Sequence, residues 1–312
     1  MRVRIAVTGA GGFVGQALCL RLARDGHAVR AISRTPIPFS SGIESVAAGD
    51  LLATDAAPLF AGCDAVVNCA ARVHVLRREE EAQARDAFER HNHHLPVRLA
   101  TTARNEGVSR FVQLSSVAAI TSTTPPGTVV DDTTKELRPC SPYGWAKRYA
   151  DEKLAALNSG RFATVALRPP AVYGPGVGAF FARLMAAAKL GLPLPVGGID
   201  NARSFIFLHN LVDAVVHAVG SSIAGTFIVT DSPPLSTAAL YRRLLALYGH
   251  PDRVWRWPAA PVHAAARLLL RQRASSLLGD AAFSGERFAR EFGWTAPVTM
   301  NEGLRLTVEG SR

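Results

Sequence analysis

The chain has 312 residues, 48% of them hydrophobic and 19% charged, a composition typical of a globular protein with one large or two smaller cores. The amino-terminal residues lead almost directly into an apolar strand pattern, without the basic segment and apolar run of a signal peptide. No stretch reaches the roughly 18 uninterrupted apolar residues that span a membrane. We therefore expect a cytoplasmic protein without stable membrane insertion.

The formal net charge of +10 is compatible with a nucleic-acid-binding protein. However, the basic residues are spread along the chain, only four of the 35 are lysines, and no nucleic-acid-binding motif is present. The net positive charge more simply implies an electrostatic field that attracts small phosphorylated substrates. We expect no nucleic-acid partner.

The stretch around which the rest is organised is an apolar run, Val3–Thr8, that stops at a cluster of glycines and continues as a helical pattern to Asp25. Its glycines suit a tight turn, a close approach of backbone to a diphosphate, and close packing of helix on strand. The free N–H groups at the helix start would face the anion. A merely structural turn is the alternative. The dinucleotide site predicted here comprises Gly9, Gly12, Phe13, Val14 and Gly15.

The second predicted strand, Ala28–Ile32, ends at Ser33 and Arg34. Enzymes that prefer NAD usually have Asp or Glu here to bind the ribose hydroxyls, and neither is present. A hydroxyl and a fixed cation suit a 2′-phosphate, so we predict NADP(H) as the preferred cofactor and NAD(H) as the second choice. The alternative is that Arg34 is a solvated loop arginine.

Asp50 and Leu51 follow a third predicted strand, Ile43–Ala47, and are expected at the cofactor. Asp50 either reaches the adenine amino group or caps a helical turn near Thr54.

The fourth predicted strand begins at Ala65 and runs into small residues, which let a cofactor lie against the backbone. Arg72 and His74 stand on the following loop, which faces substrate in this architecture. The small residues expected at the cofactor are Cys69, Ala70 and Ala71.

The long helix predicted over residues 79–106 contains the cluster His91–His94. We expect no metal site there, because adjacent histidines on an α-helix point in different directions and no carboxylate or cysteine at ligand spacing completes a set.

The cysteines are dispersed without a CxxC pair, which predicts reduced thiols. They are Cys19, Cys63, Cys69 and Cys140.

Two Tyr-x-x-x-Lys pairs stand on the helix that begins after Ser141: Tyr143 with Lys147, and Tyr149 with Lys153. They cannot both be active, because six residues turn the second tyrosine to another face of the helix. Tyr143 is favoured, since it lies in the first turn, where the helix dipole stabilises a phenolate.

Ser116 lies at the carboxyl end of the fifth predicted strand, Phe111–Leu114. When hydride reaches a ketone carbon, a proton must be delivered to the oxygen, and Tyr143 suits this role if a cationic neighbour moves its pKa toward neutrality. Lys147 supplies that charge and is expected to bind the nicotinamide ribose. Ser116 would hold the substrate oxygen, or else bond only the local backbone.

The remaining sequence predicts two units. A sixth strand, 161–167, is followed by a segment rich in proline and glycine that cannot continue a sheet, and the chain becomes mostly helical from Ser236. We expect an α/β doubly wound parallel sheet of Rossmann type with a smaller, mostly helical C-terminal substrate lobe. The expected boundaries are 1–168 plus 202–230 for the dinucleotide-binding domain and 169–201 plus 231–312 for the substrate domain.

The basic, leucine-containing segment 258–278 is compatible with a helix that contacts a membrane surface peripherally. A lobe helix whose leucines are packed inside is the favoured alternative.

The motifs resemble the extended short-chain dehydrogenase/reductase family, whose members are nucleotide-sugar epimerases, dehydratases and reductases. The resemblance implies that Ser116, Tyr143 and Lys147 form the catalytic triad, that Pro169 to Val172 lies near nicotinamide, and that Arg203 approaches the diphosphate of a nucleotide-sugar. It also implies a homodimer formed through two helices per subunit. The motifs are Thr8–Gly15, Asn68–Ala71, Leu114–Ser116, Ser141–Gly144 with Lys147, Leu167–Pro170, Val172–Gly176, Arg203–Phe205, Phe292–Trp294 and Glu302–Leu304.

Two departures from the family pattern narrow the function. Val117–Ile120 replaces the Val-Tyr-Gly that often follows the paired serines, and no acidic residue lies between Ser116 and Asp131, which disfavours a dehydratase. The segment Ala70–Val75 is similar to bacterial proteins linked to polysaccharide sugars, some of which reduce UDP-activated 4-keto deoxy amino sugars. We therefore expect a reductase of a UDP-4-keto-deoxyhexosamine. A UDP-sugar 4-epimerase with tightly bound NAD and a non-catalytic NADPH sensor or scaffold are the alternatives.

Overall fold

The computed structural model describes residues 2–39, 42–73, 81–134, 136–231, 233–270 and 278–311. Its centre is a sheet of seven parallel strands in the order β3-β2-β1-β4-β5-β6-β9. The order reverses between β1 and β4, as in a doubly wound dinucleotide-binding fold, so the predicted fold class is confirmed. The strands are β1 (Arg4–Thr8), β2 (Ala28–Ser33), β3 (Ile43–Ala47), β4 (Ala65–Asn68), β5 (Arg110–Leu114), β6 (Ala163–Arg168) and β9 (Gly225–Ile228).

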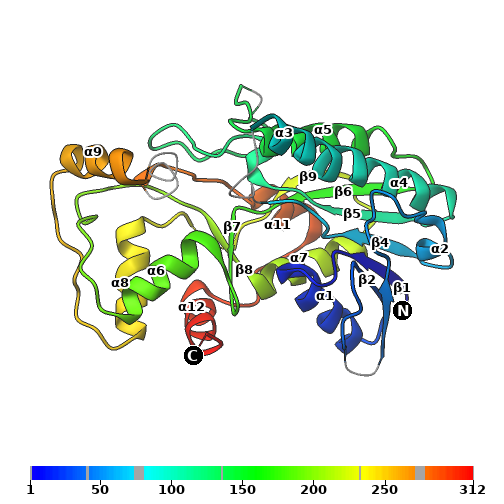
Figure 1. Cartoon of the computed structure of the whole chain (residues 1–312), viewed down its shortest axis with the longest axis horizontal. Helices are drawn as coiled ribbons and strands as arrows, with labels where there is room; N and C mark the ends of the chain where they lie inside the picture. Colours follow the sequence, from blue (N-terminus) through cyan, green and yellow to red (C-terminus); the bar gives the residue numbers. More distant parts are fainter. Residues whose placement is uncertain are drawn as a thin grey trace.

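Helices cover both faces of this sheet (Figure 1). Alternate residues of a strand point to opposite faces, so Ile5 and Val7 of β1 pack on one face while Ala6 packs on the other. Burial on both faces explains why central strands such as β1 and β4 are almost continuously apolar, whereas the edge strand β3 is largely exposed. The first face is covered by α1 (Phe13–Arg24), α7 (Leu208–Val219) and α11 (Glu286–Phe292), and the second by α2 (Ala57–Phe60), α4 (Leu95–Asn105) and α5 (Pro142–Ala155).

The helix predicted over 79–106 is interrupted by a π turn. Helix α3 (Glu81–Glu89) continues into the π-helical segment η1 (Arg90–His94) and then into α4, and residues 79 and 80 lie outside the described part. Pro96 gives a physical reason, because proline has no N–H for the carbonyl four residues earlier and its ring would clash with that carbonyl in an unbroken α-helix. The extra residue of the π turn shifts the register there.

The smaller lobe has its own apolar core, which includes Phe181, Leu184, Tyr241 and Leu244. No helix within the described residues is long and apolar enough to cross a membrane. The lobe is mostly helical, as predicted, and its helices are α6 (Ala179–Lys189), α8 (Thr237–Leu247), α9 (Ala259–Leu270) and α12 (Met300–Glu309).

Two features of the C-terminal half differ from the prediction. On α9, Val262 packs in the lobe core, whereas Leu268 is 79% exposed and is therefore not one of the packed leucines expected there. Phe288 of α11 and Trp294 pack in the core of the large sheet, although the predicted boundary placed them in the substrate lobe.

The proline-rich segment after β6 contains a strand that the sequence did not predict. Strand β7 (Ala171–Tyr173) pairs in parallel with β8 (Phe205–Phe207), and the two form a separate sheet between the large sheet and the lobe. Proline removes only its own N–H, so the three residues that follow Pro170 keep their donors and can pair. The prediction that this segment does not continue the main sheet is confirmed.

Candidate active site

The glycine turn between β1 and α1 brings three stretches of backbone into close contact. Gly9 has a φ of +68°, and a Cβ built on it would lie 2.5 Å from the Ala70 nitrogen. A Cβ on Gly15 would lie 2.2 Å from the Gly9 carbonyl oxygen. Gly12 is the N-cap of α1 and is exposed. The turn thus joins the ends of β1 and β4 to the helix start and leaves the first N–H groups of α1 open, which fits the diphosphate of a dinucleotide.

The residues expected at the adenosine end lie at the same edge of the sheet. Arg34 is exposed at the end of β2, and the Ser33 hydroxyl donates to the Thr35 carbonyl at 2.6 Å. Asp50 Oδ1 accepts from the Leu52 N–H at 2.9 Å, which is the capping role weighed above. The Leu51 side chain packs in the core beneath the sheet, so it faces away from the cofactor position.

Ser116, Tyr143 and Lys147 are brought together at the carboxyl ends of the strands. Ser116 begins the 3-10 turn η2 (Val117–Ala119), where its Oγ accepts from the Ala118 N–H at 3.2 Å, and its side chain is hydrogen-bonded to Tyr143. Lys147 is 1% exposed and donates from Nζ to the Leu114 carbonyl at 2.8 Å, with the ammonium 6.0 Å from the centre of the Tyr143 ring. The Ser116 hydroxyl and the Tyr143 phenol thus lie close enough to donate hydrogen bonds to the same acceptor atom.

The cap that starts α5 fixes the position of the phenol. The Ser141 hydroxyl oxygen accepts from the Gly144 N–H at 3.2 Å, as predicted for an N-cap. A Cβ on Gly144 would lie 2.3 Å from the Ala118 carbonyl oxygen, so a glycine is needed where α5 meets η2. This contact holds Tyr143 beside Ser116.

Burial dominates the protonation of the two titratable groups. It raises the pKa of Tyr143 to about 12, although the Ser116 hydrogen bond acts in the opposite direction. Burial lowers the pKa of Lys147 to about 8, and the negative charge of Asp151 partly offsets this. The expected shift of the Tyr143 pKa toward neutrality is not seen in the protein alone, and the phenol is protonated at pH 7.

The second pair, Tyr149 and Lys153, lies on the outer side of α5. Tyr149 is 40% exposed and stacks on Trp145, with ring centres 5.5 Å apart. Lys153 is exposed and lines a groove with His93. Neither faces Ser116, so the geometry favours the first pair.

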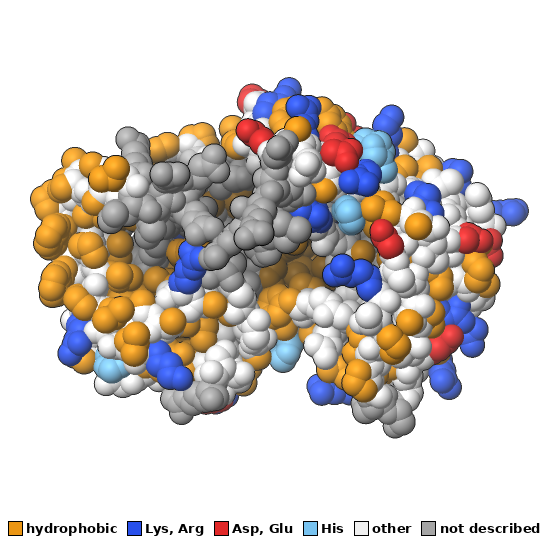
Figure 2. Space-filling view, viewed as in Figure 1, with side chains coloured by type: hydrophobic (Ala, Val, Ile, Leu, Met, Phe, Trp, Pro, Cys, Tyr) orange, Lys and Arg blue, Asp and Glu red, His pale blue; other side chains and the backbone are white. Residues whose placement is uncertain are grey.

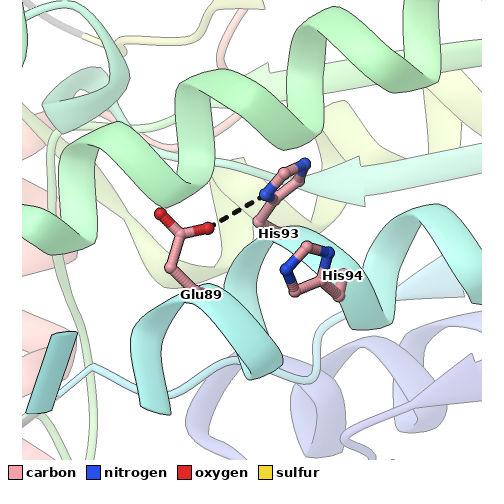
Figure 3. A group of neighbouring side chains, drawn as sticks. All are labelled: Glu89, His93 and His94. Atoms are coloured by element: carbon pink, nitrogen blue, oxygen red, sulfur yellow. Dashed lines mark hydrogen bonds and ion pairs between the residues drawn. The ribbon is translucent and has the colours of Figure 1, made fainter. Parts of the chain in front are cut away.

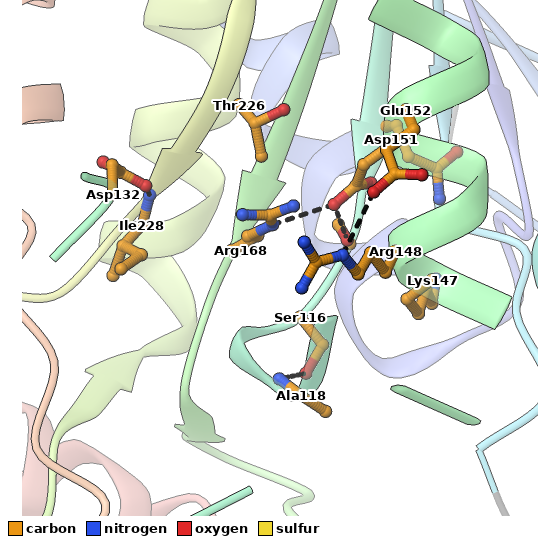
Figure 4. A network of polar contacts seen from close by, with 12 residues as sticks. Ser116, Ala118, Asp132, Lys147, Arg148, Asp151, Glu152, Arg168, Thr226 and Ile228 are labelled. Atoms are coloured by element: carbon orange, nitrogen blue, oxygen red, sulfur yellow. Dashed lines mark hydrogen bonds and ion pairs between the residues drawn. The ribbon is translucent and has the colours of Figure 1, made fainter. Parts of the chain in front are cut away.

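A buried polar network that the sequence motifs did not indicate lies behind the pair. Asp151 is 2% exposed, and its Oδ2 accepts from Arg168 Nε at 2.8 Å (Figure 4). The same oxygen accepts from the Ser115 hydroxyl, also at 2.8 Å. The available signal was spacing, because an acid four residues after Lys147 shares its helix face and an acid on a buried face needs a partner.

The comparisons with known proteins agree with this geometry. The model of the NAD dependent epimerase/dehydratase family matches residues 5–227. The chain belongs to this family. It is thus an NAD(P)-dependent enzyme of the short-chain dehydrogenase/reductase type, which confirms the resemblance seen in the sequence.

Two curated relatives cover most of the chain. A UDP-glucose 4-epimerase of Vibrio cholerae is 32% identical over 98% of this chain and 94% of its own. A dTDP-4-dehydro-6-deoxy-D-allose reductase of Streptomyces bikiniensis is 29% identical over 88% of this chain and 90% of its own. Among solved structures, a UDP-N-acetylglucosamine 4-epimerase from Methanobrevibacter ruminantium shares the fold with a TM-score of 0.80, at 19% identity and with 99% and 98% of the two chains covered.

Two of the residues predicted to bind substrate outside the Ser116 turn, Arg72 and Arg203, lie in the described part of the structure. The backbone of Arg72 is held by Asn92, whose side chain accepts from its N–H at 2.9 Å and donates to its carbonyl at 2.7 Å. His74 lies outside the described residues. Arg203 is buried at the junction with the lobe, where its Nη1 donates to the Gly279 carbonyl at 2.8 Å and burial lowers its pKa to about 10. The surface is hollowed between the two lobes (Figure 2).

Pro169 and Val172 lie on the segment that leaves β6, as the nicotinamide prediction requires. The Pro169 carbonyl accepts from the Val117 N–H at 3.1 Å, which ties the segment to the Ser116 turn. Val172 pairs with Ile206 in the β7–β8 sheet.

The histidine cluster has a carboxylate neighbour that the sequence did not predict. Because η1 is a π turn, Glu89, His93 and His94 gather with ligand atoms within 4.8 Å of one another, and Glu89 Oε2 lies 3.0 Å from His93 Nδ1 (Figure 3). A carboxylate at ligand spacing is therefore present, contrary to the expectation. The two imidazoles stack with their centres 4.4 Å apart and their planes at 26°, so their in-plane lone pairs do not converge on one point.

Replacing Gly15 with alanine tests the glycine turn. The added Cβ has to displace the Gly9 carbonyl, so we expect the free energy of unfolding to fall by about 2 kcal/mol and the nicotinamide cofactor to bind at least about tenfold more weakly. Thermal unfolding and cofactor titration measure both effects. Gly178→Ala is the matched control, because Gly178 caps α6 with a φ of −103° and has no atom within 4 Å of a built Cβ. Normal cofactor binding by the Gly15 variant would contradict the assignment.

Proposed function

We propose that this enzyme reduces the 4-keto group of a UDP-activated deoxyhexosamine. The observation that carries the proposal is the Ser116–Tyr143 pair, whose phenol is held protonated by burial at the carboxyl edge of the sheet. A protonated phenol is the form that gives a proton to a ketone oxygen during reduction. The Streptomyces relative, a reductase by name, supports the same direction.

The chain's residues have separate tasks in this reaction. The glycine turn of Gly9, Gly12 and Gly15 would hold a reduced nicotinamide cofactor, which when bound would supply the hydride for C4. Tyr143 donates its phenolic proton to the O4 oxygen, and Ser116 donates a hydrogen bond that holds that oxygen. Lys147 places a positive charge beside the phenolate that results, which limits the cost of forming an anion in a buried site. We assign Arg203, at the junction with the lobe, to the substrate diphosphate.

Replacing Tyr143 with phenylalanine tests the proton donor. We expect kcat to fall about 10²- to 10⁴-fold while the NADPH affinity stays unchanged, because the ring is kept and only the proton is lost. Oxidation of NADPH in the presence of a UDP-4-keto-6-deoxyhexosamine measures the rate. Tyr149→Phe is the matched control on the same helix and should retain full activity. Loss of activity in the control, with a normal Tyr143→Phe enzyme, would transfer the role to the second pair.

We also propose that the enzyme prefers NADP(H). The support is the absence of an acidic side chain at the end of β2 together with the exposed guanidinium of Arg34, which can form charge-assisted hydrogen bonds with a 2′-phosphate. Ser33 adds a neighbouring hydroxyl.

Replacing Arg34 with alanine separates the two cofactors. The NADPH dissociation constant should rise about 10- to 100-fold, as expected for loss of a charge-assisted hydrogen bond, while that of NADH stays within about twofold. Fluorescence titration of both reduced cofactors gives the constants. An equal effect on both, or none, would rule out recognition of the 2′-phosphate by Arg34.

A 4-epimerase is the second candidate, favoured by the Vibrio cholerae relative named UDP-glucose 4-epimerase. The same side chains serve this reaction, with Tyr143 first accepting and later returning the O4 proton. Incubation with UDP-glucose or UDP-N-acetylglucosamine distinguishes the two: an epimerase inverts C4 without net cofactor use, whereas the reductase consumes NADPH with the 4-keto sugar.

We propose a homodimer formed through the outer face of α3 and α5. Tyr149 is exposed there, and a groove of about 770 Å³ runs between the two helices, lined in part by Glu89, Trp145 and Tyr149. Exposed stacked aromatic rings beside a groove are typical of an interface.

Replacing Tyr149 with arginine should convert the proposed dimer into a monomer, because a desolvated charge would face itself across the two-fold axis. Light scattering after size-exclusion chromatography measures the mass. Val129→Arg, at another exposed apolar residue, serves as the control and should leave the mass unchanged. A wild-type protein that is monomeric at all concentrations would contradict the proposal.

A further inference from the structure

Asp151 stands on the same face of α5 as Tyr143 and Lys147, one turn after the lysine and two turns after the tyrosine. Its side chain is 1% exposed, and Oδ2 accepts from Arg168 at the end of β6 at 2.8 Å (Figure 4). Ser115, directly after β5, donates to the same oxygen at 2.8 Å. The site therefore contains a third titratable group that has no role in the proposed reaction.

The hydrogen bonds favour the ionised form of Asp151. Oδ2 accepts from two donors, one of them a guanidinium, and Oδ1 is buried without a partner among the described residues. A proton placed on Oδ1 would therefore have no acceptor. Burial raises the pKa of this carboxyl, while the charges of Arg168 and Lys147 and the Ser115 hydrogen bond act against the rise.

Lys147 has one anionic neighbour. The groups that face it in the described structure are the Leu114 carbonyl, the Tyr143 phenol, the Cys69 thiol after β4, and Asp151. Burial raises the pKa of Tyr143 and of Cys69, so both are neutral at pH 7. Among the described groups that face the lysine, the Asp151 carboxylate therefore carries the negative charge, which opposes the loss of the lysine's proton.

We propose that Asp151 is a positioning residue that keeps Lys147 in its ammonium form at neutral pH, with Arg168 holding the carboxylate ionised in turn. The charges alternate from β6 to the active site, positive at Arg168, negative at Asp151 and positive at Lys147. This arrangement compensates each buried charge by its neighbour. The effect of Asp151 on turnover rests on the proposed function, in which Lys147 is catalytic. Its effect on the protonation of Lys147 does not depend on that function.

Burial already lowers the pKa of Lys147 to about 8 with Asp151 present. Removing the negative charge lowers it further, toward or below neutrality. The same charge also raises the pKa of Tyr143. Ketone reduction uses the ammonium and the protonated phenol, and both lose their protons more easily in Asp151→Asn. The alkaline limb of the pH–rate profile for reduction therefore moves to lower pH.

The test is a pH titration of the lysine side chains by NMR in the full-length protein labelled with ¹³C and ¹⁵N lysine. The chain has only four lysines, and the Lys147 signal is identified by its loss in Lys147→Arg. We expect its midpoint to fall by at least about 1 pH unit in Asp151→Asn and to stay in place in Asp151→Glu, which keeps the charge. Glu152→Gln is the matched control, because Glu152 is the exposed next residue and pairs with Arg148 instead.

A folded Asp151→Asn protein with an unchanged Lys147 midpoint would overturn the proposal. If that variant does not fold, Asp151→Ser supplies the same readout, because it removes the charge but leaves an acceptor for Arg168. The titration needs no substrate, so it decides the role of Asp151 even if no UDP-4-keto sugar is reduced. Where the wild type is active, a shift of the alkaline limb by at least about 1 pH unit, reversed in Asp151→Glu, links the ammonium to catalysis.

Discussion

The contact on which the site depends is the one between the β1 turn and the end of β4. In a parallel sheet whose strand order reverses between β1 and β4, the connections leave in opposite directions and open a crevice at the carboxyl edge. Gly9 closes the bottom of this crevice by lying against the Ala70 backbone, and Gly15 brings α1 onto the same turn. Side chains at these positions would force the strands and the helix apart. Backbone contact, rather than side-chain chemistry, thus creates the room for a dinucleotide.

Helix α5 then determines the chemistry. Its N-cap and its glycine contact with η2 fix its start. The helical repeat then places Tyr143, which is half-buried, and the buried Lys147 and Asp151 along one face. Trp145 and Tyr149 lie on the other side, where the rings stack. One helix thereby presents titratable groups to the crevice and aromatic groups to the exterior. A rotation of this helix would alter both surfaces together.

Local signals explain what the sequence could predict. The strand, glycine turn and helix at the amino terminus are contiguous, and Ser141, Tyr143 and Lys147 lie within seven residues, so caps and helical spacing were sufficient. The parallel, doubly wound character of the sheet followed from the repeated alternation of strands and helices.

Contacts between distant segments explain what the sequence could not predict. The pairing of Asp151 with Arg168 joins a helix to a strand, and β7 pairs with a strand more than thirty residues later. Trp294 donates to Asp213 at 3.0 Å and so draws α11 onto the large sheet, across a predicted domain boundary. The π turn depends on how one proline is accommodated within a long helix, which periodicity alone does not report.

The protonation of the site also bears on the direction of the reaction. An epimerase begins by removing a proton from a sugar hydroxyl, which needs a phenolate, whereas burial keeps Tyr143 protonated in the protein alone. Asp151 adds to this preference, because its negative charge disfavours a second anion on the same helix face. Lys147 acts in the other direction, with its ammonium hydrogen-bonded to the Leu114 carbonyl and 6.0 Å from the centre of the Tyr143 ring. The resting charges therefore suit donation of a proton to a ketone, and an epimerase would need the positive charge of an oxidised cofactor to reverse that balance.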